Sequence, residues 1–435
     1  MSFLELKEKV IDTDLCARCG ACNGSCPVGC IEFRSNIDFS PTLNGGKCIN
    51  CKRCTTICPG LGYEINRKIE GKKYDTIIGS YLSIYTGVST SEEILSSCSS
   101  GGVITSLLVY LFSKNIITEA IVVSNTLNSE EGYASGIIAR NVSDVIKASQ
   151  SKYANVATLN LLKEAKKTNN KIAVVGVPCQ IAALEKYCTI DNSFSNKVIL
   201  KIGLFCGYTY TSDCFEYLFR YMGVEKQNVK AIKGWREDGV PGFFSVLLKN
   251  GDIKRISFQE EHALDTVFFS QNRCLLCKDC FSEYADLVVG DVGHFSYKDS
   301  LVIARTERGN NLLMDCCSSG DIKLIERSIE YALRRTVINF MHREKREKVE
   351  ERIKLYSKDS RPFPSWNLPS SKKSIANKII VKKQYKARQP QKRAFILENS
   401  KRHYKYGKYL YLGLENSFFI RLIRKIERIL YRNEH

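Results

Sequence analysis

The sequence lacks a long apolar run, a leader peptide and the common nucleotide-binding motifs. No stretch approaches the roughly 18 to 20 uncharged apolar residues of a membrane-spanning helix, so we expect none. The beginning, MSFLELKEKVIDTD, has no apolar core and carries four acids, which predicts a cytoplasmic protein. Neither a Walker nor a GxGxxG sequence is present. Only five histidines occur, and the best placed, His294 near a predicted strand end, is typical of a surface residue.

Length and composition describe a soluble globular protein of several units. The chain has 435 residues, of which 44% are hydrophobic and 26% charged, and this length predicts about two to four units. The net charge of +19 is uneven, because residues 367–435 contain 18 Lys and Arg against four Glu. The basic character therefore belongs to a C-terminal tail, and the rest of the chain is close to neutral.

Cysteine is the residue that the chain has in excess. Nineteen occur, nine of them before residue 60 and three more within 274–280. A disulfide framework is not expected in a chain of this length without a secretion signal. Clustered cysteines in a reducing compartment usually bind metal, so their distribution predicts metal sites.

Two matching cysteine runs near the N-terminus form the most specific motif, each with the spacing Cys-x2-Cys-x2-Cys-x3-Cys-Pro. In such a run, three closely spaced thiolates hold one corner of a cubane [4Fe–4S] cluster, and the fourth reaches the other cluster. We therefore expect one cluster on Cys16, Cys19, Cys22 and Cys58. We expect a second cluster on Cys48, Cys51, Cys54 and Cys26.

A zinc site is the alternative for these runs. Zinc normally takes four ligands from two CxxC pairs, which would leave the duplicated Cys-Pro endings at Pro27 and Pro59 unexplained. Cys30 lies outside the repeated pattern, and we expect it to be a bystander.

A second group of cysteines has a less specific pattern. Cys274, Cys277 and Cys280 form half of a similar run without the Cys-Pro ending, so any cluster there needs further ligands. Cys179 begins a predicted helix, where the helix dipole favours a thiolate. Cys206 ends a predicted strand, at the edge where parallel strands present ligands. These residues could hold a third cluster, or Cys179 and Cys206 could be small buried hydrophobes.

A serine–glycine turn, Ser99-Ser100-Gly101-Gly102, precedes another predicted helix. Amides and hydroxyls at a helix N-terminus suit a phosphate. An ordinary helix cap explains the same residues equally well, so both interpretations stay open.

The pattern of apolar residues predicts the fold class. Short Cys-, Gly- and Pro-rich segments in 1–70 would be held together by metal rather than by a core. Beyond them, β-branched runs predict strands at 119–125, 171–177, 198–206 and 285–291. Helices are expected at 99–115, after Pro178, at 211–222 and within 321–355. This alternation predicts an α/β core with a largely parallel sheet, α+β overall with the small N-terminal unit.

The chain divides accordingly into a small unit at 1–70, core regions at 75–160 and 165–335, and a basic linker and tail at 360–435. The tail ends in SFFIRLIRKIERILYR (417–432), an amphipathic helical pattern with basic residues on one face. A solvated tail or a helix on the inner membrane surface is the favoured interpretation. Tyrosines among the basic residues could stack on bases, but nucleic-acid binding is not favoured.

A resemblance to a known family rests on five segments in a fixed order: SSCSSGGVITSLLVYL, QSKYANV (150–156), VVGVPCQIAAL (174–184), GLFCGY (203–208) and CLLC…ADLVVGD (274–291). Together they resemble the beta subunits of coenzyme F420 hydrogenases and dehydrogenases, over residues 10 to about 330. The sequence departs at GDVGHF (290–295), where bacterial members often have a GD-aromatic-Trp-Gly pattern. The basic tail also lies outside the resemblance.

The resemblance implies a mixed-sheet flavoprotein core that binds FAD beside iron–sulfur clusters, after a bacterial-ferredoxin-type domain with two [4Fe–4S] clusters. It implies that the turn at Ser99, Ser100, Gly101 and Gly102 borders the flavin or its partner, together with Ser151, Lys152 and Tyr153. It also makes Cys179, Cys206, Cys274 and Cys277 the expected ligands of a third [4Fe–4S] cluster, with Cys280 as a competitor.

The implied function is that of an iron–sulfur flavoprotein within an oxidoreductase. Clusters transfer single electrons and a hydride acceptor takes two, and a flavin can join the two processes. The acceptor would be coenzyme F420 or another small organic molecule, and the partner an electron carrier protein or a catalytic subunit. The alternatives are an F420-independent reductase of a small metabolite or sugar, and a pure electron-transfer subunit without its own substrate site.

Overall fold

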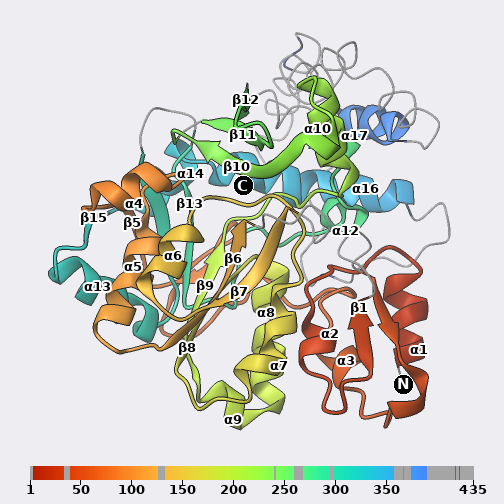
Figure 1. Ribbon diagram of the computed structural model, residues 1–435, viewed down its shortest axis with the longest axis horizontal. Helices are drawn as coiled ribbons and strands as arrows, with labels where there is room; N and C mark the ends of the chain where they lie inside the picture. Colours follow the sequence, from red (N-terminus) through yellow and green to blue (C-terminus); the bar gives the residue numbers. More distant parts are fainter. Residues whose placement is uncertain are drawn as a thin grey trace, which may run out of the picture.

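The computed structural model describes residues 3–33, 40–125, 133–239, 242–258, 268–293, 298–356, 366, 374–388, 417 and 421. Within these residues the largest element is a sheet of eight strands (Figure 1). In spatial order the strands are β15 (Ile322–Glu326), β5 (Ser83–Ser89), β14 (Ser300–Ala304), β13 (Leu287–Asp291), β9 (Val198–Leu204), β8 (Ile172–Gly176), β6 (Glu119–Asn125) and β7 (Ala134–Ala139).

The centre of this sheet is parallel. β13, β9, β8 and β6 run in one direction, and the strands on both sides pair antiparallel to them or to one another. These four central strands are the ones that the β-branched runs predict, because such residues fit a sheet that is buried on both faces. The predicted α/β class is confirmed, and the sheet is mixed rather than parallel throughout.

Helices cover both faces of the sheet. α5 (Val103–Ser113) and α13 (Glu307–Ser318) pack on the face that carries Ala173. α7 (Leu162–Ala165) and α8 (Pro178–Ile190) pack on the opposite face, which carries Ile172 and Val174. Shorter helices join these elements: α4 (Glu92–Ser97), α6 (Val142–Lys147), η3 (Thr158–Leu161), α9 (Asn192–Ser195), η4 (Lys226–Asn228) and α12 (Asn272–Leu275).

The N-terminal unit lies beside α7 and α8 (Figure 1). Glycines permit this close approach: a Cβ on Gly24 would lie 2.0 Å from the Leu159 carbonyl oxygen, and a Cβ on Gly20 would lie 2.6 Å from the Asn160 amide nitrogen. The elements of the unit are α1 (Phe3–Leu6), the π-helical turn η1 (Lys7–Ile11), α2 (Ala21–Gly24), β1 (Ile31–Phe33), β2 (Pro41–Leu43), η2 (Gly45–Lys47) and α3 (Arg53–Thr56). The hairpin of β3 (Lys73–Asp75) and β4 (Gly79–Tyr81) follows.

The helical prediction for 321–355 is wrong at its start. Residues 322–326 form β15, which pairs antiparallel with β5 and completes one edge of the sheet. Helical structure begins only after it, with α14 (Ile329–Arg335), α15 (Ile338–His342), the π-helical turn η5 (Arg343–Glu347) and α16 (Lys348–Tyr356). The edge strand buries only Ile322 of its five residues, so its sequence carries little of the apolar alternation that identifies a strand.

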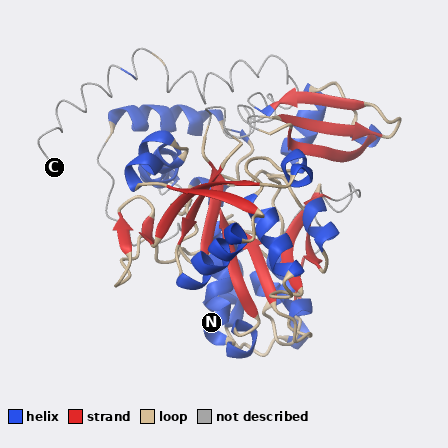
Figure 2. Ribbon diagram, turned by 90° about the vertical axis from the view of Figure 1, so that its left-hand side faces the viewer, coloured by secondary structure: helices blue, strands red, loops and turns tan. Residues whose placement is uncertain are grey.

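A second, three-stranded sheet was not predicted. It consists of β10 (Val229–Glu237), β11 (Phe243–Leu248) and β12 (Ile253–Ser257), and Figure 2 shows it set apart from the large sheet. Asn250-Gly251 joins β11 to β12, with Gly251 at a φ of 93°. Asn-Gly between two apolar runs is a strong hairpin signal, so the β11–β12 hairpin could have been predicted from the sequence.

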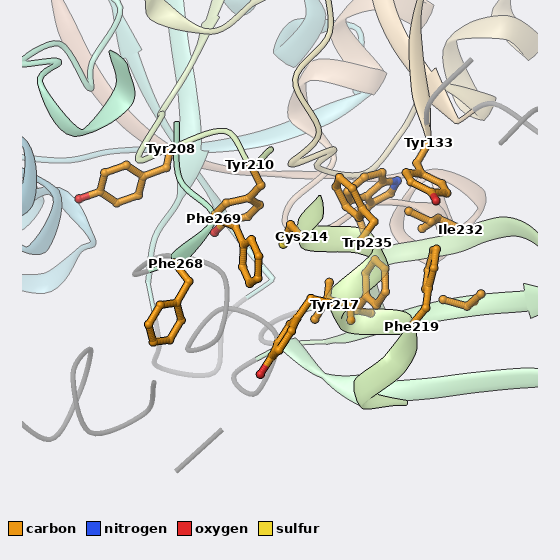
Figure 3. Packing of buried hydrophobic residues seen from close by; sticks show 14 of the residues in the cluster. Tyr133, Tyr208, Tyr210, Cys214, Tyr217, Phe219, Ile232, Trp235, Phe268 and Phe269 are labelled. Atoms are coloured by element: carbon orange, nitrogen blue, oxygen red, sulfur yellow. The ribbon is translucent and has the colours of Figure 1, made fainter. Parts of the chain in front are cut away.

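An aromatic core fixes the second sheet to the large one. Trp235 of β10 is fully buried, its ring lies 5.4 Å from that of Phe215, and Phe215 lies 5.0 Å from Tyr133. Figure 3 shows Trp235 and Tyr133 in this cluster, to which α10 (Asp213–Tyr221) supplies several rings. The Trp235 indole N–H donates to the Asn125 side-chain oxygen at 2.6 Å, at the carboxyl end of β6. The two sheets are therefore joined at the edge where the parallel strands end.

The C-terminal residues that the structure describes pack on the core. α17 (Ile375–Ala387) contacts α16 and buries Ala376, Ile380 and Val381. The Trp366 indole donates to the Leu276 carbonyl at 3.1 Å. The amphipathic pattern at 417–432 lies outside the described residues apart from positions 417 and 421. Among the helices that the structure describes, none is both long and apolar enough to span a bilayer.

Candidate functional site

The two N-terminal cysteine loops share an unusual backbone conformation. Arg18 and Gly20 have φ values of 51° and 85°, and Asn50 and Lys52, at the matching positions of the second run, have 52° and 62°. Three of the four are not glycine, and the backbone strain at each of these three residues costs of the order of 1 kcal/mol or more. Alternating left-handed residues turn successive N–H groups inward and form a concavity for anions, including iron–sulfur clusters. The backbone therefore fits the predicted group.

Cys16, Cys19, Cys22 and Cys58 form what we call the inner thiol set. Burial, followed by the charge of Cys58, raises the pKa of Cys16 to about 12, and burial, followed by the charge of Cys16, raises that of Cys22. Amides point at two of the sulfurs: Arg18 N donates to Cys16 Sγ and Gly60 N donates to Cys58 Sγ, both at 3.3 Å. Buried neighbouring thiols ionise together only when a metal centre supplies positive charge.

Cys26, Cys48, Cys51 and Cys54 form the outer thiol set. Burial, and then the charges of Cys51, Cys26 and Cys48, raise the pKa of Cys54 to about 11, although the Thr55 amide acts against them. All four cysteines line a cavity of about 340 Å³ that includes space open to solvent. Cys51 is exposed. The outer set therefore reaches the surface, whereas Cys19 of the inner set is buried.

Cys30 lies closer to the outer set than its position in the sequence suggests. Its Sγ is 3.5 Å from Cys26 Sγ. Burial alone would raise the pKa of Cys26. Hydrogen bonds from the Cys30 amide, the Cys30 thiol and the Val28 and Gly29 amides together lower it by more than burial raises it, so the net shift of the pKa is downward. A lowered pKa suits a metal-binding thiolate, and Cys30 itself stays a predicted bystander.

Cys179, Cys206, Cys274 and Cys277 form the third thiol set, which separate segments of the core bring together. Burial, followed by the charges of Cys277 and Cys274, raises the pKa of Cys179 to about 12. Burial also raises the pKa of Cys206; Lys345 opposes this shift, while Cys274, Cys179 and Cys277 add to it. Leu276 has a φ of −101°, so this loop does not repeat the conformation of the two N-terminal loops.

Cys280, the predicted competitor, is fully buried among apolar residues such as Phe281 and Ala285. Its carbonyl accepts from the Cys206 amide at 3.2 Å. In the described part of the chain, no three His, Cys, Asp or Glu side chains converge closely enough to share one metal ion. A cubane uses one thiolate per iron, so the ligand assignments stay predictions.

The inner and third thiol sets are neighbours. Burial and then the charge of Cys179 raise the pKa of Cys19. Arg273, the residue before Cys274, donates from Nη2 to the carbonyl of Pro59, the residue after Cys58, at 2.8 Å. The N-terminal unit and the core therefore meet where two of the predicted clusters lie.

The serine–glycine turn and the Ser151–Tyr153 segment also meet. The Ser151 amide donates to Ser99 Oγ at 3.0 Å. The Gly101 amide donates to Ser300 Oγ at 3.1 Å, so this one amide is already engaged within the protein. Gly102, with a φ of 72°, caps α5. The structure brings the two predicted flavin segments together and also gives the turn a structural role.

Tyr153 extends this site toward the end of β13. Its ring lies 5.6 Å from that of Phe258, and the Arg236 guanidinium lies 4.7 Å above the same Phe258 ring. Arg236 is buried and forms an ion pair with Asp291, the last residue of β13. Burial opposes the charge of Arg236, but Tyr153 and Asp291 keep its pKa above the ordinary value. Aromatic rings beside an ion pair at strand carboxyl ends suit a polar, ring-containing ligand.

Sequence reasoning missed several residues at these sites. Arg273 and Lys345 lie beside the third set, Arg236 beside Tyr153, and Trp366 against Arg273. Arg273 could have been noticed because it directly precedes Cys274, but Lys345 and Trp366 reach the site only through tertiary packing. His294 lies outside the described residues.

Lys152 carries a testable pH dependence. Its ammonium donates to the carbonyls of Ala148, Ser149 and Gln150 after α6, and burial lowers its pKa from 10.5 to about 7. The unfolded chain then binds more protons than the folded one between about pH 7 and 10.5, so this group makes stability rise with pH in that range. We expect Lys152→Met to remove this part of the rise, measured as Tm from pH 7 to 9.

The matched control is Lys147→Met, which removes an exposed lysine from the last turn of α6, the helix that precedes Lys152. It should leave the slope of Tm against pH unchanged. If Lys152→Met has the wild-type slope, then the folded protein does not suppress the charge of Lys152.

Comparisons with known proteins agree with this architecture. Two models of the coenzyme F420 hydrogenase/dehydrogenase beta subunits match the chain: residues 84–163 match the N-terminal model, and residues 169–329 match the C-terminal model. The chain is similar to one chain of a solved F420-reducing [NiFe] hydrogenase complex from Methanosarcina barkeri, with a TM-score of 0.52 and 25% identity. That match covers 65% of this chain and 95% of the other.

Curated relatives give the same result. One of the subunits of the F(420)H(2) dehydrogenase of Methanosarcina mazei is 30% identical over 312 residues, which are 69% of this chain and 82% of the relative. Coenzyme F420-dependent sulfite reductase of Methanocaldococcus jannaschii is 29% identical over 321 residues, 70% of this chain but only 46% of that enzyme. The chain belongs to the family of coenzyme F420 hydrogenase/dehydrogenase beta subunits.

Proposed function

We propose that the chain is an iron–sulfur flavoprotein subunit of an oxidoreductase, which passes electrons between [4Fe–4S] clusters, FAD and coenzyme F420 or a related organic acceptor. Relatives named for F420-linked enzymes support this assignment. The observation that carries it is the meeting of the inner and third thiol sets through Cys19, Cys179 and the Arg273–Pro59 hydrogen bond. A ferredoxin-type unit in this position would feed electrons directly into the core.

The bound cofactors would supply one-electron transfer at the clusters and the conversion between single and paired electrons at the flavin. The residues of the chain would hold them. Left-handed loop residues and amides would surround the inner and outer clusters. Ser99, Ser151 and Tyr153, with the Arg236–Asp291 pair, would border the flavin and the organic acceptor.

An anaerobic count of iron, sulfide and flavin per chain tests the cofactor content. Three cubanes and one FAD predict about twelve irons, about twelve sulfides and one flavin. About eight irons would remove the third cluster. The loaded protein should then reduce F420 when it receives electrons from dithionite; failure with F420 and with every other acceptor would favour the pure electron-transfer alternative.

The surface around the outer thiol set suits a negatively charged redox protein as partner. Residues 40–63 contain Lys47, Lys52 and Arg53 but no acid. Ile49 beside them is 61% exposed, and Cys51 is exposed. Opposite charges steer such a partner and mainly raise its association rate.

Lys47→Glu should therefore lower the rate of electron transfer from an acidic carrier such as a ferredoxin, by roughly tenfold at low salt, and weaken its dependence on ionic strength. Stopped-flow reduction at several salt concentrations measures both effects. Lys73→Glu in β3 makes the same charge change at another exposed position and should have little effect. Equal slowing by both variants would mean that overall charge, rather than this surface, matters.

We place the protein in the cytoplasm, with contact between the basic tail and the membrane as a prediction that falls outside the described residues. Flotation with anionic vesicles, with and without residues 416–435, tests this contact. Equal flotation of the two proteins would contradict it.

A further inference from the structure

Arg273 is a buried cation at the junction of the N-terminal unit and the core. It lies in α12, directly before Cys274 of the third thiol set, and is 3% exposed. Its Nη2 donates to the carbonyl of Pro59, directly after Cys58 of the inner thiol set, at 2.8 Å. The Trp366 ring lies 5.3 Å from the guanidinium carbon. One side chain thus borders both sets.

Two donors of this guanidinium lack a partner in the described part of the chain. Nε and Nη1 of Arg273 are buried and have no hydrogen-bond acceptor among the described residues. Arginine has five N–H donors and cannot lose its charge in a protein. Buried donors of a charged group are costly to leave unsatisfied, so these two groups indicate an anionic acceptor beside Arg273.

The position of Arg273 indicates which anion this is. Arg273 directly precedes Cys274 of the third thiol set, and its Nη2 donates to the carbonyl of the residue that follows Cys58 of the inner thiol set. The thiolates of these two sets are therefore the anionic groups that the position of Arg273 indicates.

We infer that Arg273 is the shared counter-cation of two iron–sulfur clusters, one on the inner and one on the third thiol set, with Nε and Nη1 as donors to their sulfur atoms. This inference rests on the proposed function. Each cluster gains one negative charge when it accepts an electron, and a fixed cation stabilises that charge in a buried site. Arg273 therefore raises the reduction potential of both clusters and weakens the repulsion between them when both are reduced.

Two lysines provide matched controls, because each borders one set alone. The Lys186 ammonium donates to the Cys58 carbonyl at 3.3 Å, on the inner side. The Lys345 ammonium donates to the Cys274 carbonyl at 2.9 Å, on the third side, and the charges of Cys277, Cys274 and Cys206 keep its pKa above the ordinary value despite burial. Their removal identifies which reduction step belongs to which cluster.

The experiment is an anaerobic redox titration of the full-length protein, followed by electron paramagnetic resonance, on wild type, Arg273→Gln, Lys186→Gln and Lys345→Gln. Lys186→Gln should shift one reduction step and Lys345→Gln another. Arg273→Gln should shift both steps to more negative potentials, each by about 59 mV or more, which is a tenfold change in a one-electron equilibrium. A shift of only one of these steps, or of neither, overturns the inference.

Iron content separates failure of the inference from failure of the proposed function. Fewer than about twelve irons in the wild type contradicts the three-cluster proposal itself. About twelve irons with unchanged potentials in Arg273→Gln contradicts only the role of Arg273. If Arg273→Gln loses iron, Arg273→Lys carries the test: it keeps the charge but loses the Nε and Nη1 donors, so both steps should move negatively by a smaller amount. No movement in Arg273→Lys then overturns the inference.

Discussion

Replacing Cys179 with alanine is expected to lower the iron content of the anaerobically purified protein from about twelve to about eight atoms per chain. Cys179 lies in the first turn of α8. Burial is the largest cause of its raised pKa, and the charges of Cys277 and Cys274 are the next largest causes. Without this thiolate, one iron of the proposed third cluster would have no protein ligand. Reduction of F420 should be lost with the four irons, because in the proposed path the electrons pass from the N-terminal unit through the third cluster to the flavin.

Two further alanine variants make this result specific. Cys188→Ala is the matched control, since Cys188 is a buried cysteine on the same helix that packs among apolar residues, and it should keep about twelve irons. Cys280→Ala should also keep them, because Cys280 packs against Phe281 and Ala285 in an apolar cluster. If Cys280→Ala loses four irons and Cys179→Ala loses none, our ligand assignment is contradicted.

The second large effect is expected at the seam between the N-terminal unit and the core. Gly24→Val places a side chain where a Cβ alone would lie 2.0 Å from the Leu159 carbonyl oxygen. Backbone atoms cannot move aside as a flexible side chain can, and overpacking of this kind costs about 1–3 kcal/mol. That cost weakens docking of the unit by roughly 5- to 150-fold.

Gly24→Val should keep about twelve irons, because glycine supplies no ligand to the proposed clusters, but reduction of the proposed flavin by the proposed N-terminal clusters should be far slower. Stopped-flow spectra of cluster and flavin absorbance measure the two steps separately. Thr56→Val is the matched control: Thr56 occupies the equivalent position of the second cysteine run and is exposed. Flavin reduction at the wild-type rate in Gly24→Val would mean that electrons do not cross this seam.

The sequence was informative where local chemistry decides the structure. The spacing of the cysteine runs predicts that Cys16, Cys22 and Cys58 share a cluster, and in the structure the charges of Cys16 and Cys58 act on Cys22, although Cys58 is 36 positions beyond Cys22. Central strands such as β6 and β8 were predicted because runs of Val and Ile fit a doubly covered sheet. In the same way, Pro178 correctly marked the first turn of α8.

The remainder depends on packing between distant segments, which residue patterns do not record. Lys345 reaches Cys274 across 71 positions, and Trp366 reaches Leu276 across 90. The left-handed conformations of Arg18 and Lys52 were also invisible, because these residue types rarely adopt a positive φ, whereas Asn50 is of a type that does so more often. Residues that tune the predicted clusters are therefore harder to find from sequence than residues that bind them.

The two glycines at the seam make the two copies of the cysteine motif structurally inequivalent. Gly20 and Gly24 of the first cysteine run correspond by position to Lys52 and Thr56 of the second, both of them exposed. The two cysteine runs have a similar backbone conformation, yet only the first run can approach Leu159 and Asn160 closely. If the two runs were identical, either of them could dock on the core. Because only the first run has glycines at these two positions, the first run faces the core and the second run faces the solvent.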